Sequence, residues 1–163
     1  KLSSKEKEEA VMEILNKIPQ KIALWDKKII KKIIPIIIER IHVWSDIVDL
    51  VENGELDFFF EKPKYERSQL LWKKNKDLEK TKKHLEKTKE LLKEVPDNKF
   101  NIEMIKGAVW DYAEREGRGD VLWPFRVSLT GKEKSPDPFY VSSVIGKDET
   151  LERIQSAIEK ILS

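Results

Sequence analysis

Within residues 121–139 the chain gathers side chains that are chemically suited to contact unpaired nucleotide bases. An arginine and a small hydroxyl can hydrogen-bond the edges of bases, while aromatic rings and prolines can stack against their faces. The candidate residues are Trp123, Arg126, Ser135, Pro136, Pro138 and Phe139. The same residue types also serve as caps and core positions of a small helical domain. Composition alone therefore leaves both interpretations open.

The chain carries no arrangement of residues that would support catalysis on its own. It has no Cys, so a thiol nucleophile is excluded, and its two His, His42 and His84, are far apart in the sequence. A His-based triad and a zinc site are therefore not expected. The sequence contains no glycine-rich phosphate loop and no nucleophile elbow, and most carboxylates stand beside lysines at helical spacing. We expect no active site, metal or cofactor in this chain.

Arg118-Gly119-Asp120 matches the tripeptide of integrin ligands. It directly follows Gly117, a residue suited to end a helix, and no secretion signal precedes it in the sequence. We interpret it as the start of a new element and not as an adhesion motif.

Residues 62–94 form a basic segment. They contain twelve Lys or Arg and six Asp or Glu, a local net charge of +6 in a chain whose formal net charge is only +2. Such a segment attracts phosphates, and we select Lys73, Lys74 and Lys132 as weaker candidates for phosphate contacts. The alternative is a solvated helix face in which lysines and glutamates alternate.

The composition favours an all-α protein. Charged residues make up 38% of the 163 residues and hydrophobic residues 39%, with only 6 Gly, which suits helices better than strands and turns. We expect a helical bundle of two packed subdomains, 1–96 and 97–163, divided at Pro96. The apolar run 29–41 is interrupted by charges, so no membrane span is predicted. A cytoplasmic location is expected, and the absence of an initial Met suggests a fragment.

Cap and stop signals divide the first part of the chain into helices. A capping box at Ser3 predicts the first helix, Asp26 begins a second in which Pro35 should introduce a kink or a break, and Ser45 should cap a third that ends at Asn53-Gly54. In the last third, helices are expected to begin at Asn101, Val121, Pro138 and Asp148.

Between them, residues 68–95 are expected to form one long helix. Leu71, Leu78, Leu85 and Leu92 recur every seven residues, with Thr at the other seam position. Because a free coiled coil needs apolar residues at both seam positions, packing against neighbouring helices is favoured. A helical adaptor that binds a partner through these heptads remains an alternative.

The segment 124–131 reads Pro-Phe-Arg-Val-Ser-Leu-Thr-Gly, and it is followed by Ser135-Pro136 and by Ile145-Gly-Lys-Asp. In this order and spacing, these motifs resemble the C-terminal signature of glutamyl-tRNA synthetases. The segment 39–46, Glu-Arg-Ile-His-Val-Trp-Ser-Asp, together with the aromatic block 58–60, is similar to an earlier part of the same family. The resemblance covers nearly the whole chain.

The resemblance implies a class I synthetase whose C-terminal α-helical cage reads the anticodon. It implies that a separate Rossmann domain, absent from this sequence, ligates glutamate to tRNA with ATP and Mg. On this basis the chain itself is not an enzyme, and its partner is glutamate tRNA. Whether glutamine tRNA is also a partner is left open, and we expect a monomer.

By the same resemblance, Arg126 contacts anticodon bases and Trp123 neighbours them. Ser135, Pro136, Pro138 and Phe139 correspond to the turn that meets the other bases, with Pro138 at a position where relatives have an apolar side chain. Arg40 aligns with an arginine that meets the third anticodon base and separates glutamate from glutamine tRNAs, although it could equally be a surface helix residue. The related cage of class I lysyl-tRNA synthetases is the nearest rival.

Overall fold

The computed structural model describes residues 1–73 and 76–163. Within these ranges every regular element is a helix, which confirms the all-α prediction, and none of them combines the length and apolar character needed to cross a membrane. The chain divides into two compact units, residues 1–61 and 62–163. This division differs from the expected boundary at 96/97, because the helix before that boundary packs against the last helix of the chain.

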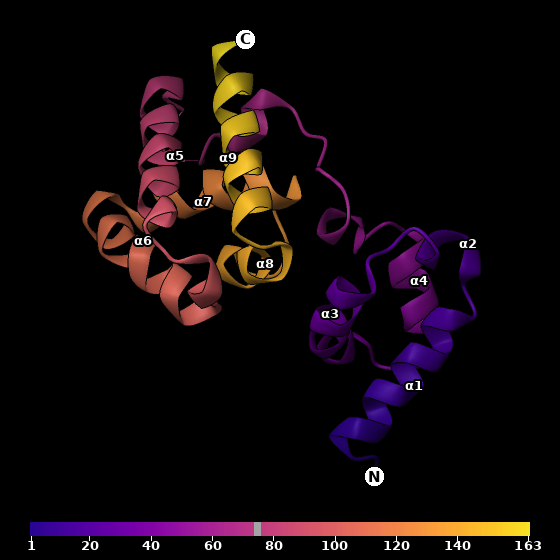
Figure 1. Cartoon of the computed structure of the whole chain (residues 1–163). Helices are drawn as coiled ribbons and strands as arrows, with labels where there is room; N and C mark the ends of the chain where they lie inside the picture. The colour runs from indigo at the N-terminus through magenta and orange to yellow at the C-terminus, as the bar shows by residue number, and fades with distance from the viewer. Residues whose placement is uncertain (74–75) are drawn as a thin grey trace. The chain divides into compact units, whose positions relative to one another are not determined.

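The first unit is a small helical cluster (Figure 1). Its α-helices are α1 (Ser4–Asn16), α2 (Pro19–Ile22), α3 (Lys27–Arg40) and α4 (Asp46–Glu52), followed by a 3₁₀ turn at Asp57–Phe59. The helix α1 packs against α3 and α4 and buries Val11 and Leu15. The apolar residues of α3 that recur at helical spacing, Ile33 and Ile37, are fully buried as well.

Local caps explain where the helices of the first unit begin. The capping box at Ser3 and the cap at Asp26 are confirmed, and α3 runs through Pro35 as one helix. Ser45 occupies the N-cap position of α4, as expected, but its side chain makes no cap hydrogen bond. The Asp46 carboxylate instead accepts hydrogen bonds from the backbone N–H groups of His42 and Val43, at 2.8 and 3.0 Å, and so fixes the turn before α4.

The second unit contains the remaining α-helices of the described residues, among them α7, which carries most of the candidate site. They are α5 (Leu78–Lys93), α6 (Ile102–Glu116), α7 (Arg118–Thr130), α8 (Pro138–Ile145) and α9 (Lys147–Leu162), with 3₁₀ turns at Arg67–Leu70 and Asp97–Lys99. In Figure 1, α5 and α9 run side by side, and α7 crosses behind them. The helix α7 packs against α5, α6, α8 and α9 and is therefore the centre of this unit.

The long helix expected from residue 68 begins only at Leu78. Asp77 caps it by accepting from the N–H groups of Glu79 and Lys80, whereas residues 71–73 are not helical. The heptad positions Leu85 and Leu92 are fully buried, since α5 packs against α9 and α7. This confirms that the heptads face neighbouring helices, and it leaves the adaptor alternative without an exposed apolar seam on α5.

Other start positions also shift from those expected. The helix α7 begins at Arg118 and not at Val121, directly after Gly117, whose φ of +112° lets the chain turn between α6 and α7. Gly146 precedes α9, so Asp148 lies in its first turn instead of capping it. Asn101 caps α6 and Pro138 opens α8, as predicted.

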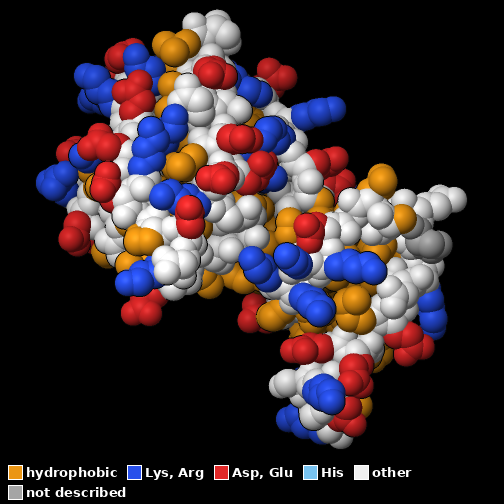
Figure 2. Space-filling model, in the orientation of Figure 1, with side chains coloured by type: hydrophobic (Ala, Val, Ile, Leu, Met, Phe, Trp, Pro, Cys, Tyr) orange, Lys and Arg blue, Asp and Glu red, His pale blue; other side chains and the backbone are white. Residues whose placement is uncertain are grey.

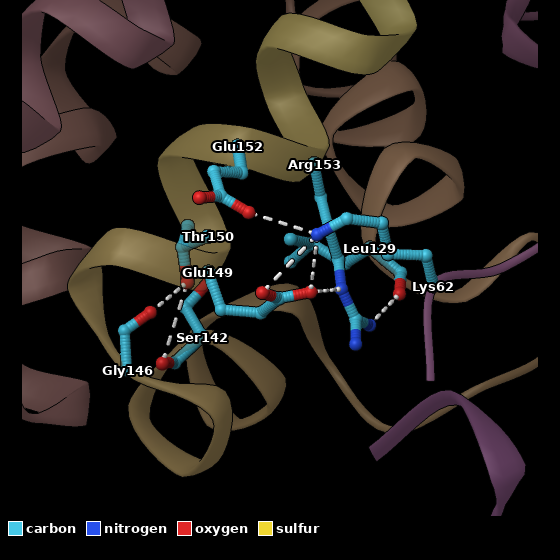
Figure 3. Close-up of polar contacts among 8 residues, drawn as sticks. All are labelled: Lys62, Leu129, Ser142, Gly146, Glu149, Thr150, Glu152 and Arg153. Atoms are coloured by element: carbon cyan, nitrogen blue, oxygen red, sulfur yellow. Dashed lines mark hydrogen bonds and ion pairs between the residues drawn. The ribbon is translucent and has the colours of Figure 1, made fainter. Parts of the chain in front are cut away.

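A buried arginine fixes the C-terminal end of α7. The side chain of Arg153 on α9 is 2% exposed; its Nη1 donates to the carbonyl oxygen of Leu129 at 2.7 Å and its Nε donates to Glu149 at 2.9 Å (Figure 3). The Lys62 ammonium group also donates to the carboxylates of Glu149 and Glu152. Since the last carbonyls of a helix lack partners within it, this cation both satisfies and orients the end of α7.

Candidate functional site

A pocket of about 550 Å³ opens on the second unit, beside α7. Its walls come from the first three turns of α7, from the loop after α7 and from the segment that precedes α5. The lining residues are Trp72, Arg118, Gly119, Leu122, Trp123, Arg126, Glu133, Lys134 and Ser135. A pocket of this volume lies within the range of roughly 300–1,000 Å³ that is typical of small-molecule sites.

Arg126 is tied to the loop by one of its nitrogens. Its Nη1 donates to the carbonyl oxygen of Ser135 at 2.7 Å, to the Ser135 hydroxyl at 3.0 Å and to the carbonyl oxygen of Pro136 at 3.3 Å. The Ser135 hydroxyl in turn donates to the carbonyl oxygen of Pro136 at 2.9 Å. These bonds fold the loop back onto α7 and hold the guanidinium at the pocket wall.

The guanidinium of Arg126 is half-buried, and no carboxylate of residues 1–73 or 76–163 is found in an ion pair with it. Burial lowers the pKa of Arg126, while the negative charge of Asp137 acts in the opposite direction. A partly desolvated cation without a carboxylate partner attracts electron-rich groups such as phosphate or the acceptor edge of a base. Within the part of the chain that the structure describes, Nη2 and Nε donate to no other residue, which leaves them for such a ligand.

Trp123 forms the aromatic wall next to Arg126. Its indole N–H donates to the carbonyl oxygen of Gln69 at 2.9 Å, so the polar edge of the ring is used within the protein. The ring of Trp72 lies 5.2 Å away from it, centroid to centroid, at an interplanar angle of 51°. The face of Trp123, and not its nitrogen, is therefore the part that can meet a ligand.

The structure brings together only part of the predicted set. Trp123, Arg126 and Ser135 line one pocket, and the carbonyl oxygen of Pro136 accepts a hydrogen bond from Arg126. Pro138 and Phe139 are buried instead, and the Phe139 ring packs against Phe125 at 6.3 Å and against Trp110 at 6.4 Å. Both residues thus belong to the side of α8 that is buried, where α8 packs against α6 and α7.

The remaining predicted residues lie elsewhere. Arg40 is the exposed last residue of α3, in the first unit. Lys73 is exposed, Lys132 is half-buried with its backbone N–H bonded to Thr130, and Lys74 lies outside the described residues.

The charged surface of the second unit is mixed. On the face seen in Figure 2, cationic and anionic side chains are interspersed over this unit. Along α5, Lys82 pairs with Glu79 at 3.0 Å and Lys87 pairs with Glu90 at 3.1 Å. These pairs leave the net charge of +6 unchanged, because Glu79 and Glu90 are already counted in it, but they show lysines and glutamates interspersed along α5, as the solvated-helix alternative predicts.

Several lining residues carried no signal in the sequence. Trp72 is separated from Trp123 by fifty residues and lies in a segment that was expected to be helical. Arg118 and Gly119 belong to the tripeptide that resembles an integrin motif, and they lie in the first turn of α7. The sequence predicted that this helix begins at Val121. Because α7 begins at Arg118 instead, Arg118 and Gly119 lie on the pocket wall that carries Arg126.

Comparison with known proteins identifies the family to which the chain is related. The family described as "Anticodon binding domain" matches residues 5–158. The glutamate-tRNA ligase of Clostridium acetobutylicum is 33% identical over 136 residues, which are 81% of this chain and 27% of the relative. That of Flavobacterium johnsoniae is 35% identical over 133 residues, 80% of this chain and 24% of the relative. The chain thus spans about a quarter of the length of these curated relatives.

Solved structures show the same relationship. A glutamate tRNA ligase from Elizabethkingia meningosepticum matches 94% of this chain and 29% of its own with a TM-score of 0.73 and 29% identity. A glutamate-tRNA synthetase from Elizabethkingia anophelis matches 97% of this chain and 32% of its own with a TM-score of 0.65 and 28% identity. The chain therefore belongs to the anticodon binding domain family, in the form found in glutamyl-tRNA synthetases.

Proposed function

We propose that this domain binds the anticodon of glutamate tRNA through the pocket around Arg126. The observation that carries the proposal is the state of Arg126: a half-buried guanidinium held by Ser135 and Pro136 through Nη1 alone, at the wall of a pocket with an aromatic face. A fixed guanidinium can donate two parallel hydrogen bonds to a base edge, which gives selectivity as well as affinity.

In this proposal each residue has a separate task. Arg126 donates to the acceptors of an unstacked anticodon base, and Trp123 offers the face of its ring. Ser135 and Pro136 hold the guanidinium in the orientation that the base requires. Arg40, on the first unit, meets the third anticodon base and separates glutamate from glutamine tRNA. Lys73, Lys74 and Lys132 add weaker contacts to phosphates, and these contacts do not depend on sequence.

The domain contributes binding and not chemistry. We propose that it belongs to a glutamate-tRNA ligase, in which another domain uses ATP and Mg to attach glutamate to the tRNA. In that ligase, the pocket around Arg126 would hold the anticodon while the other end of the tRNA reacts in the catalytic domain. We further propose that the protein acts as a monomer in the cytoplasm.

Binding to three tRNAs tests this proposal. Glutamate tRNA, glutamine tRNA and an unrelated tRNA are titrated against the protein at two salt concentrations. We expect glutamate tRNA to bind best and its advantage to persist at the higher salt concentration, since base contacts are less sensitive to salt than phosphate contacts. Equal and salt-sensitive binding to all three would leave only phosphate contacts and would contradict the proposal. Preference for a lysine tRNA would instead indicate the related lysyl type.

A further inference from the structure

The pocket has a second aromatic wall that the resemblance did not assign. Trp72 lies in the segment before α5, is half-buried and lines the pocket together with Trp123. Stacking a base between two rings requires about 7 Å between them, twice the normal contact distance of roughly 3.5 Å. The centroids of the two indoles are only 5.2 Å apart. A base can therefore stack on the pocket side of this pair but not between its rings.

Gly119 explains how Trp72 reaches this position. A Cβ atom built on Gly119 would lie 2.5 Å from both Cε2 and Nε1 of Trp72 and 2.9 Å from its Cζ2. The backbone of Gly119 is ordinary for a helix, since it is not among the residues with positive φ. Gly119 is the second residue of α7, and its helical backbone alone does not require a glycine. The close approach of the Trp72 indole is a reason for a residue without Cβ at this position.

Cations flank this wall on two sides. Arg118 lies over the ring of Trp110, with 4.9 Å from its Cζ to the centroid, and pairs with Glu114. Arg126 stands on the next turns of α7, and Lys134 follows in the exposed loop. A stacked base leaves its own phosphate outside the pocket, where cations of this kind can meet it. The pocket thus offers a ring face, an edge donor and a phosphate partner for one nucleotide.

We propose that Trp72 stacks on a base of the single-stranded anticodon loop and that Gly119 is the residue that keeps its indole in place. This inference rests on the proposed function, and it adds a recognition residue from a segment outside the signature motifs. Each residue then has a separate contact with the base: Arg126 hydrogen-bonds its edge, and the Trp72 and Trp123 pair stacks on its face.

The test uses the whole chain and the isolated anticodon stem-loop of glutamate tRNA. Three further stem-loops each lack one anticodon base, with the sugar and phosphate retained. The variants are Trp72→Ala, Trp72→Tyr and Gly119→Ala, with Trp44→Ala as the control because Trp44 is an exposed tryptophan of the first unit. Thermal unfolding followed by circular dichroism verifies that each variant is folded.

Loss of one stacked base typically weakens binding about tenfold to a hundredfold, so this is the loss expected for Trp72→Ala. Removing the base that stacks on Trp72 should lower the affinity of the unsubstituted protein by a similar factor. The same removal should hardly lower the affinity of Trp72→Ala any further, because that variant has already lost the contact. Trp72→Tyr should retain most of the affinity, Gly119→Ala should weaken the same contact, and Trp44→Ala should bind normally.

Several outcomes would overturn the inference. If the unsubstituted protein prefers the stem-loop but Trp72→Ala binds it within twofold as tightly, the proposed function stands and Trp72 has no part in it. If Trp72→Ala weakens all four stem-loops by the same factor, Trp72 has only a structural role. If the unsubstituted protein shows no preference over an unrelated hairpin, the proposed function fails and this inference fails with it.

Discussion

Arg126 is bound to the protein on one side and available on the other. All three of its acceptors, from Ser135 and Pro136, meet Nη1. The charge of Asp137 acts on Arg126, but no carboxylate of the described residues forms an ion pair with its guanidinium. The geometry instead leaves a fixed, partly desolvated donor at the pocket wall. At the scale of single residues, this asymmetry is the strongest sign of a binding role.

Ser135→Ala tests the orientation of Arg126. The substitution removes one acceptor of Nη1 and the hydroxyl bond to Pro136. Since a neutral hydrogen bond contributes about 1 kcal/mol, the affinity for glutamate tRNA should fall about threefold to tenfold. Ser143→Ala is the matched control, because Ser143 also bonds a nearby carbonyl, that of Tyr140, but lies on α8 away from the pocket. Equal affinity for both variants, measured by titration, would contradict the role of Ser135.

Glu149 gives the stability of the α7 end a dependence on pH. Burial alone would raise the pKa of Glu149, but the hydrogen bonds from Arg153 and Lys62 outweigh it, and the pKa is lowered from 4.5. A carboxyl whose pKa is lower in the folded protein than in the unfolded chain stabilises the folded protein at pH values above the pKa of the unfolded chain. This stabilisation is lost as the pH falls through the pKa of the folded protein.

Glu149→Gln should therefore unfold more easily than the unsubstituted protein at neutral pH. Urea unfolding at several pH values measures the difference, which should shrink below pH 4.5. Glu133→Gln is the control, since Glu133 is exposed and makes no contact with Arg153. A difference that stays constant down to strongly acidic pH would show that the charge of Glu149 is not what stabilises this site.

The sequence was informative about residues inside the signature and silent about the others. Arg126, Trp123 and Ser135 could be selected because cations, rings and hydroxyls occur together within a short segment, and the structure places them in one pocket. Pro138 and Phe139 belong to the same segment but are buried, since the α8 face that carries them packs inward. Trp72 could not be found, because no local spacing relates it to α7.

At the scale of elements, caps were predicted more reliably than helix length. Asp26 and Asn101 cap helices as expected, because the side chain of each accepts hydrogen bonds from the first backbone N–H groups of its helix. The helix predicted from residue 68 instead starts at Leu78, since a seven-residue repeat of leucines continues through Leu71 although the backbone there is not helical. Periodicity reports which face is apolar, but it does not report where the backbone leaves the helix.

Leu85→Ala tests whether the heptads of α5 serve the core. Leu85 is fully buried between α5 and its neighbours, so the substitution should cost about 2–5 kcal/mol of unfolding free energy. Lys83→Ala, on the exposed face of the same helix, should change it by less than about 0.5 kcal/mol. Chemical unfolding measures both. Little destabilisation by Leu85→Ala, together with loss of self-association, would instead support the adaptor alternative.

At the scale of the whole molecule, the division into units follows the packing of α5. The boundary expected at Pro96 was reasonable, because Pro96 does follow the end of a helix. The interfaces that bury Leu85 and Leu92, however, join α5 to α7 and α9 across that boundary. Long-range packing of this kind depends on the side of a helix that each distant element covers, and a single sequence does not specify it.

A polypeptide of residues 62–163 should therefore fold on its own, whereas residues 97–163 should not. The longer piece retains α5 and the core that it shares with α7 and α9, and the shorter piece exposes that core. Circular dichroism and amide hydrogen exchange would compare the two. A stable, cooperatively unfolding 97–163 would contradict the division at 61/62 and would favour the boundary at 96/97.

The anticodon preference of Arg126→Ala tests most directly whether Arg126 contacts the anticodon bases. The isolated stem-loop of glutamate tRNA and a stem-loop with altered anticodon bases compete for the unsubstituted protein and for this variant. We predict that the unsubstituted protein prefers the natural anticodon by about fivefold to 150-fold, as expected from a bidentate contact of about 1–3 kcal/mol, and that Arg126→Ala loses most of this preference while remaining folded. An Arg126→Ala protein that keeps the full preference would show that Arg126 does not recognise the anticodon.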